Sequence, residues 1–142
     1  MLTGMPRPLP DRDTQPFWDG CRDGRFLVPR CAACGHARWP PGPMCPTCQS
    51  TDTDWIESSG RGTVYSWIVA THPVDPVLAD QVPYVVAMID LPEGVRVVGN
   101  VDGCRPEEVT AGMEVELFFS DPGEDGIPIP SFRAADQANR ER

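Results

Sequence analysis

Residues 31–48 read CAACGHARWPPGPMCPTC and contain four of the six cysteines of the chain. These cysteines form two Cys-x-x-Cys turns with ten residues between them. Two thiolates on one tight turn hold the same metal ion, and two facing turns complete a tetrahedral four-sulfur shell. The stretch therefore predicts a zinc ribbon in which Cys31, Cys34, Cys45 and Cys48 bind one structural Zn²⁺ ion.

Other metal or redox centres fit the pattern less well. A c-type haem needs a histidine directly after the second cysteine, where this chain has Gly35. A thioredoxin-like motif needs a single cysteine pair beside a βαβ unit. Four thiolates also hold iron, so a small iron electron carrier is an alternative. A filled four-sulfur shell has no open position, so we expect the metal to stabilise a short, proline-rich segment and not to perform chemistry.

The sequence beyond the ribbon is rich in β-branched and aromatic residues, which is typical of strands. The expected strands are 60–73, 82–91, 94–101, 113–119 and 127–133. A short helix is expected over 106–112, because Pro106 suits the first helical position and Gly112 follows the end. Five strands with a helix between the third and fourth indicate an OB-fold barrel.

A second short helix is expected before the ribbon, over 13–22, with Asp13 or Thr14 as N-cap and Pro16 in the first turn. The predicted fold class is therefore mainly β: an N-terminal helix, a rubredoxin-like zinc ribbon and a five-stranded OB-fold barrel. The expected divisions are 1–23 (a disordered or strap-like leader and the helix), 24–58 (ribbon), 59–133 (OB-fold) and 134–142 (polar tail).

Length and charge restrict the function. The 142 residues suffice for one domain or two small modules. All 12 basic residues are arginines, and with 21 acidic residues the net charge is −9. That charge opposes nonspecific nucleic-acid binding, which depends on neutralising phosphates. Neither a signal peptide nor an apolar run long enough for a membrane span is visible, so we expect a cytoplasmic protein without membrane contact.

No catalytic array is evident among the residues that carry chemistry. His72 lies beside a proline at the end of a predicted strand, and neither Cys21 nor Cys104 has an adjacent histidine or lysine. Tyr65 and Trp67 could stack on bases, so a free-standing nucleic-acid-binding OB-fold is a second alternative, which the acidic charge weakens. We expect a chain without catalytic residues of its own.

Five motifs then occur in a fixed order. They are FWDG at 17–20, CAACG at 31–35, WPPGPMCPTC at 39–48, GRGTVYSW at 60–67 and PYVVAMIDLPEGVR at 83–96. Together they resemble the bacterial and archaeal family of zinc-ribbon plus OB-fold proteins associated with acyl-CoA enzymes. The resemblance covers residues 14–133. One position departs from it: relatives often carry arginine after the paired prolines, where this chain has Gly42.

The resemblance implies a non-catalytic small subunit of a thiolase-like acyl-CoA enzyme complex that supports assembly and the acyl-CoA channel. The large subunit would be a thiolase, an acyltransferase or a steroid side-chain (retro-)aldolase, and would hold the catalytic residues. The implied assembly is a hetero-oligomer, expected as a heterotetramer, with a CoA thioester as ligand of the complex. Phe17, Trp18 and Trp39 are the expected partner contacts.

An acidic subunit attracts the phosphates of CoA only where arginines gather at one edge. Four arginines lie within seventeen residues around the helix and ribbon. We therefore expect Arg22, Arg25 and Arg38 to lie near the CoA, while the partner supplies most of the affinity.

Overall fold

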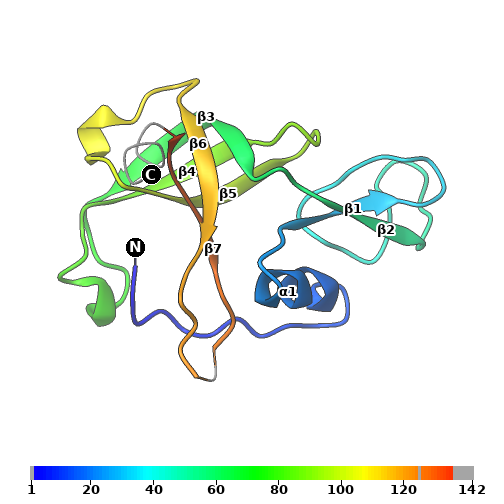
Figure 1. Ribbon diagram of the computed structural model, residues 1–142, viewed down its shortest axis with the longest axis horizontal. Helices are drawn as coiled ribbons and strands as arrows, with labels where there is room; N and C mark the ends of the chain where they lie inside the picture. Colours follow the sequence, from blue (N-terminus) through cyan, green and yellow to red (C-terminus); the bar gives the residue numbers. More distant parts are fainter. Residues whose placement is uncertain (1, 125, 136–142) are drawn as a thin grey trace.

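Two β-sheets and one helix make up the computed structural model, which describes residues 2–124 and 126–135. The elements in chain order are α1 (Gln15–Arg22), β1 (Leu27–Cys31), β2 (Thr53–Glu57), β3 (Arg61–Ala70), η1 (Pro76–Leu78), β4 (Tyr84–Asp90), β5 (Arg96–Asp102), η2 (Pro106–Glu108), β6 (Glu114–Phe119) and β7 (Pro130–Ala134). Figure 1 shows the β1–β2 hairpin projecting from one side of the barrel, with α1 beside it.

Five strands close into a barrel in the order β3-β4-β5-β7-β6 (Figure 1). Neighbouring strands are antiparallel except β5 and β7, which are parallel and pair Val101 with Phe132. The barrel closes where β3 pairs with β6, and Gly62 of β3 lies opposite Val115 of β6. A closed five-stranded barrel of this order is an OB-fold, and together with α1 and the cysteine hairpin it confirms the predicted fold class.

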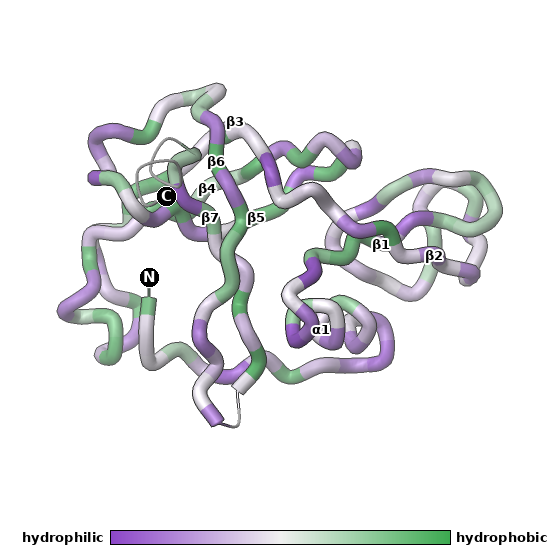
Figure 2. The backbone as a smooth tube through the Cα atoms, in the orientation of Figure 1, coloured by the Kyte–Doolittle hydropathy of each residue, from purple (hydrophilic) through white to green (hydrophobic). Residues whose placement is uncertain are grey.

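Side chains that alternate along the strands build the barrel core. On β4, Val85, Ala87 and Ile89 are buried, whereas Met88 between them is exposed. Along β6, Figure 2 shows hydrophilic residues near the start and hydrophobic ones toward the end. The barrel therefore has an apolar interior and a mixed outer surface, as the period of two in a strand requires.

The ribbon hairpin continues the same core. β1 and β2 are antiparallel, from Leu27 opposite Glu57 to Cys31 opposite Thr53. Phe26 stacks on Trp39 at 5.2 Å between ring centroids, and Phe17 of α1 packs edge-on against both rings. Phe17, Phe26 and the barrel interior belong to one continuous hydrophobic cluster.

The N-terminal segment runs past the tip of the β6–β7 loop to reach α1 (Figure 1). The backbone N–H of Thr3 donates to Oε1 of Gln81 at 2.6 Å, and Nε2 of Gln81 donates to the carbonyl of Thr3 at 2.9 Å. Before α1, Oδ1 of Asp11 accepts hydrogen bonds from the backbone N–H groups of Asp13 and Thr14. The helix begins at Gln15, and its N-cap Thr14 makes no side-chain capping bond.

The helix predicted over 106–112 is wrong in length: only the 3₁₀ turn η2 forms. Val109 takes an extended conformation and is 4% exposed, so burial of its side chain ends the turn. The expected polar tail lies mostly outside the described residues, and Ala134 belongs to β7. Within residues 2–124 and 126–135, no helix has the length and apolar character needed to cross a membrane.

Candidate metal centre and family

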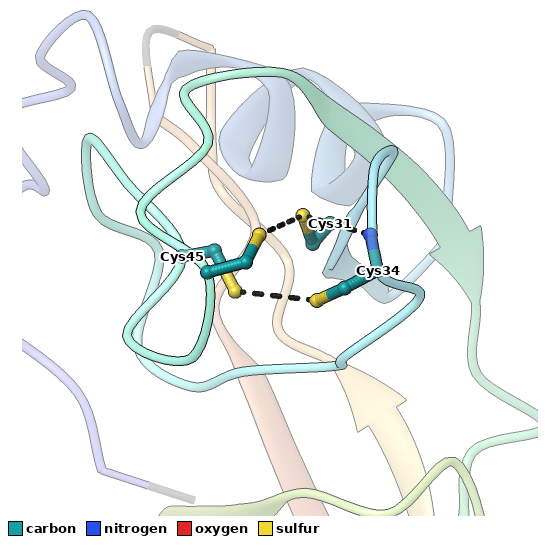
Figure 3. A group of neighbouring side chains, drawn as sticks. Cys31, Cys34 and Cys45 are labelled. Atoms are coloured by element: carbon teal, nitrogen blue, oxygen red, sulfur yellow. Dashed lines mark hydrogen bonds between the residues drawn. The ribbon is translucent and has the colours of Figure 1, made fainter.

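The four predicted metal ligands lie together at one end of the ribbon. All four Sγ atoms are within 4.8 Å of one another. The Sγ atoms of Cys31 and Cys48 are 3.5 Å apart, and those of Cys34 and Cys45 are 3.6 Å apart. Figure 3 shows the sulfur atoms turned toward a common centre. Tetrahedral zinc with Zn–S bonds of about 2.3 Å requires about 3.8 Å between sulfurs, so this group fits the ion.

Two similar turns position the sulfurs. In the first, the N–H of Cys34 approaches Sγ of Cys31 at 3.4 Å, and in the second the N–H of Thr47 approaches Sγ of Cys45 at the same distance. Gly35 follows the first pair with φ +77°, a left-handed conformation in which glycine is unstrained. The sequence therefore sets each turn locally, and the β1–β2 pairing brings the two turns together.

The backbone of the turns also favours thiolates. The N–H of Cys48 lowers the pKa of Cys45 to about 6, and the N–H of Cys34 lowers the pKa of Cys31. The N–H of Ser50 acts in the same direction on Cys48, but the thiol of Cys31 and burial raise the pKa of Cys48 to about 12. Adjacent thiolates repel one another, and a divalent cation between them removes that repulsion.

The other two cysteines are separate from this centre. Cys21 on α1 is 1% exposed, and burial raises its pKa to about 12. Burial also raises the pKa of Cys104, with a further contribution from the negative charges of Glu108 and Asp102. Both thiols are therefore poor nucleophiles at neutral pH.

The predicted arginines have different environments. Arg22 is exposed in the last turn of α1, and Arg25 forms an exposed ion pair with Glu57 at 3.3 Å. Arg38, in contrast, is buried and lines a pocket between the finger (residues 36–44, which join the two cysteine pairs) and the start of α1. Arg12 lines the same pocket. Sequence reasoning missed Arg12, because no local pattern in the leader shows that it reaches the ribbon.

The predicted partner contacts differ in exposure. Phe17 is 5% exposed, because its ring fills the space between α1 and the ribbon. The expectation of Phe17 as a surface residue that contacts a partner is therefore wrong. Trp18 and Trp39 are half-buried and pack partly against the core. Only these two tryptophans of the predicted set keep surface that a partner can reach.

Comparison with known proteins covers both modules. Residues 18–54 match the family model for the ChsH2 rubredoxin-like zinc ribbon domain. Residues 55–120 match the model for the ChsH2 C-terminal OB-fold domain. The solved structure of the "Ltp2-ChsH2(DUF35) aldolase" contains a chain that superimposes with a TM-score of 0.82 and 43% identity, covering 91% of this chain and 99% of that chain.

Curated relatives include both archaeal and bacterial proteins. A "DUF35 domain-containing scaffold protein" of Methanocaldococcus jannaschii is 39% identical, covering 69% of this chain and 72% of its own. The "Benzoylsuccinyl-CoA thiolase subunit BbsA" of Thauera aromatica is 29% identical, covering 73% and 71%. The "Probable enoyl-CoA hydratase alpha subunit" of Thermomonospora curvata is 43% identical over 92% of this chain, which spans 40% of that relative.

These matches agree with the geometry of the site, because the ribbon model, over residues 18–54, includes all four clustered cysteines. The chain therefore belongs to the ChsH2 (DUF35) family, whose members join a rubredoxin-like zinc ribbon to an OB-fold barrel.

Proposed function

We propose that the chain is a non-catalytic small subunit of a thiolase-like acyl-CoA enzyme complex. The observation that carries the proposal is the match of the whole ribbon–barrel pair to the ChsH2 chain of an aldolase, over 91% of this chain. Relatives named as a thiolase subunit and as scaffold proteins support the same role. They favour it over a free-standing nucleic-acid-binding barrel or an iron carrier.

The partner then supplies the reacting groups. It is a thiolase, an acyltransferase or a retro-aldolase, and makes or breaks a carbon–carbon or acyl bond next to the thioester. The cysteines outside the metal centre agree with a catalytic role for the partner and not for this chain, since Cys21 is buried and Cys104 has a raised pKa. The zinc ion, enclosed by four sulfurs, contributes stability to the ribbon.

An apolar patch on the outer barrel face is the surface we assign to the partner. Ile68 of β3 lies opposite Val86 of β4, and Met88 of β4 lies opposite Val98 of β5. Ile68 and Val98 are each 64% exposed, and Met88 is 42% exposed. Exposed apolar side chains that adjoin across three strands are typical of an interface core.

A polar rim borders this patch. The guanidinium of Arg96 lies 3.5 Å from the ring centroid of exposed Tyr65 and forms an ion pair with Asp90 at 2.6 Å. An apolar centre with a charged rim is the usual anatomy of a subunit interface. The exposed parts of Trp18 and Trp39 would extend the contact to the ribbon.

The complex is proposed to be a cytoplasmic heterotetramer with a CoA thioester as its ligand. The grouping of four of the six cysteines as metal ligands is the use of cysteine typical of a reducing compartment. Arg22, Arg25 and Arg38 are proposed to lie toward the CoA, and Arg38 has the most distinctive surroundings of the three.

Co-expression with a thiolase-like chain of the same organism tests the proposal. The tagged chain should retain that partner through affinity purification and gel filtration. Ile68→Asp and Val98→Asp should lose the partner while melting at an unchanged temperature. Val74→Asp is a matched control, because Val74 is an exposed valine in the loop before η1. If all three variants retain the partner equally, the apolar patch is not part of the interface. If the unaltered protein retains no thiolase-like chain, the proposed function is wrong.

A further inference from the structure

The second half of β3 has an open backbone edge beyond the point where the barrel closes. On one side, β3 pairs with β4 as far as Ala70, its last residue. On the other side, β6 pairs only with residues 61–63, and Val64 bonds to the turn before β6. In the part of the chain that the structure describes, no backbone hydrogen bond joins residues 65–70 to any segment other than β4. This stretch therefore lacks a neighbour along one edge.

Trp67 and Val69 direct their backbone groups to this open edge. Successive residues of a strand present their N–H and C=O groups to opposite edges in turn. The N–H of Val64 donates to the turn before β6, and its carbonyl accepts a hydrogen bond from the same turn. The pairing with β4 shifts by one residue between Val64 and Ser66, which moves the alternation by one position. The backbone groups of Ile68 therefore face β4, and those of Trp67 and Val69 face outward.

Apolar side chains near this edge are exposed on both faces of the sheet. Ile68 lies opposite Val86 on the outer face and is 64% exposed. Val69 lies opposite the buried Val85, so it belongs to the face that forms the core, yet it is 39% exposed. A strand added along the edge would cover both side chains.

The open stretch has few of the features that protect a free strand edge. Proteins protect such edges with charged side chains, with proline, or with bulges that twist the edge away. Residues 65–70 read YSWIVA and contain neither a charged residue nor a proline. The one irregularity in the β3–β4 register lies at the beginning of the stretch, before Ser66. Six residues extend over about 20 Å, so the edge is a template for a short added strand.

Charge indicates which kind of chain the edge accepts. Pairing with a second copy would bring together two chains of net charge −9, and their repulsion opposes self-association. The edge itself is uncharged and apolar on both faces, so the complementary strand is also uncharged and apolar on both faces. Ile68 belongs both to this edge and to the patch assigned to the thiolase-like partner. The edge and the patch therefore form one continuous surface.

We propose that the open edge of β3 binds an extended, uncharged segment of the thiolase-like subunit as an added strand. The segment accepts hydrogen bonds from the N–H groups of Trp67 and Val69 and donates to their carbonyls, and these main-chain bonds supply affinity. Its β-branched or aromatic side chains cover Ile68 and Val69. The inference rests on the proposed function and adds backbone pairing, which contacts between the side chains of the patch do not require.

Hydrogen exchange resolved to single residues tests the pairing directly. The free chain is compared with its complex with the co-expressed thiolase-like partner. The amides of Trp67 and Val69 should exchange rapidly in the free chain and at least about a hundredfold more slowly in the complex. The amide of Ile68 faces β4, so it should exchange slowly in both states and serves as the internal control.

Variants of Val69 test the same backbone group. Val69→Pro removes the N–H at the open edge without removing a bond to β4, and proline is tolerated at such positions. It should weaken partner binding at least about tenfold while melting at an unchanged temperature. Val69→Thr is the matched control, because it keeps the N–H and a β-branched side chain, so binding should change less than about twofold. Val69→Lys places a charge at the edge and should also weaken binding, which keeps the test valid if the proline variant does not fold.

Equally fast exchange of the Trp67 and Val69 amides in the free chain and in the complex overturns the inference, as does equal partner binding by Val69→Pro and Val69→Thr. Protection of both amides in a dimer of the chain alone assigns the edge to a second copy and also overturns it. A chain that retains its thiolase-like partner with both amides unprotected overturns the edge pairing alone. A chain that retains no such partner overturns the proposed function and the inference together.

Discussion

Cys45 is the most deeply buried of the four sulfur ligands, with no exposed surface. Its sulfur receives the N–H of Thr47 and lies 3.6 Å from that of Cys34. The first contact lies within one turn and the second joins the two turns, which the β1–β2 hairpin brings together, so the two Cys-x-x-Cys pairs were enough to predict the ligand set. The surroundings of Arg38 were not predictable in this way, because Gly42 and Thr53 reach it only after the ribbon has folded.

Replacement of Cys45 should remove the metal. Cys45→Ser should purify with little zinc and should melt at a lower temperature, because metal binding contributes folding free energy to the ribbon. Elemental analysis after gel filtration gives the zinc content. Cys104→Ser is the matched control and should keep one zinc per chain, since Cys104 is half-buried outside the centre. A full zinc complement in Cys45→Ser would contradict the ligand assignment.

A glycine in the barrel gives a second prediction at this scale. A Cβ on Gly62 would lie 2.6 Å from Cγ2 of Ile89 and 3.0 Å from the carbonyl oxygen of Asp90. Gly62→Ala should therefore lower the free energy of unfolding by about 1–3 kcal/mol, as overpacking does. Urea denaturation measures this value. Gly42→Ala, with open space around it, should shift it far less, and equal losses in both variants would contradict the packing described for β3 and β4.

At the scale of elements, α1 is held by an aromatic cluster. The ring of Phe17 lies 5.2 Å from the rings of both Phe26 and Trp39. The short helix has Thr14 as its N-cap and Pro16 in its first turn, the two signals that made its position predictable. Its packing was not, because an apolar residue on a predicted helix can face either a partner or the core of its own chain. The same limit explains η2, where burial of Val109 overrode local helix signals.

Truncation of this cluster should loosen α1. Phe17→Ala should lower the free energy of unfolding by about 3–5 kcal/mol, because it removes a buried aromatic ring and leaves a cavity. Trp18→Ala, on a half-buried neighbour, should lower it less. Denaturant unfolding followed by tryptophan fluorescence and circular dichroism measures both. A greater loss from Trp18→Ala would show that the helix packs by its other face.

At the scale of the whole molecule, ribbon and barrel share one core. The continuous cluster of buried residues runs from Phe17 and Val28 to Ile89 and Phe132. The abundance of β-branched and aromatic residues predicted the barrel strands, since strand propensity is a local property. The union of the two modules depends on contacts between distant segments, so it could not be predicted from the pattern of either one.

The shared core predicts cooperative unfolding. The zinc-loaded chain should melt in a single calorimetric transition, because separating the ribbon would expose part of the core that the barrel also uses. Removal of zinc with a chelator should lower the midpoint temperature of that transition, and the barrel and the ribbon should still unfold together. Two well-separated transitions in the loaded chain would show that the modules fold independently.

The central claim is that this chain works within a complex whose other subunit performs the chemistry. Native mass spectrometry of the chain co-expressed with its thiolase-like partner tests it most directly. The predicted spectrum shows a heterotetramer containing both kinds of chain, with one zinc for each copy of this one. A spectrum in which the 15.6 kDa chain remains free while the thiolase-like protein assembles without it would contradict the claim.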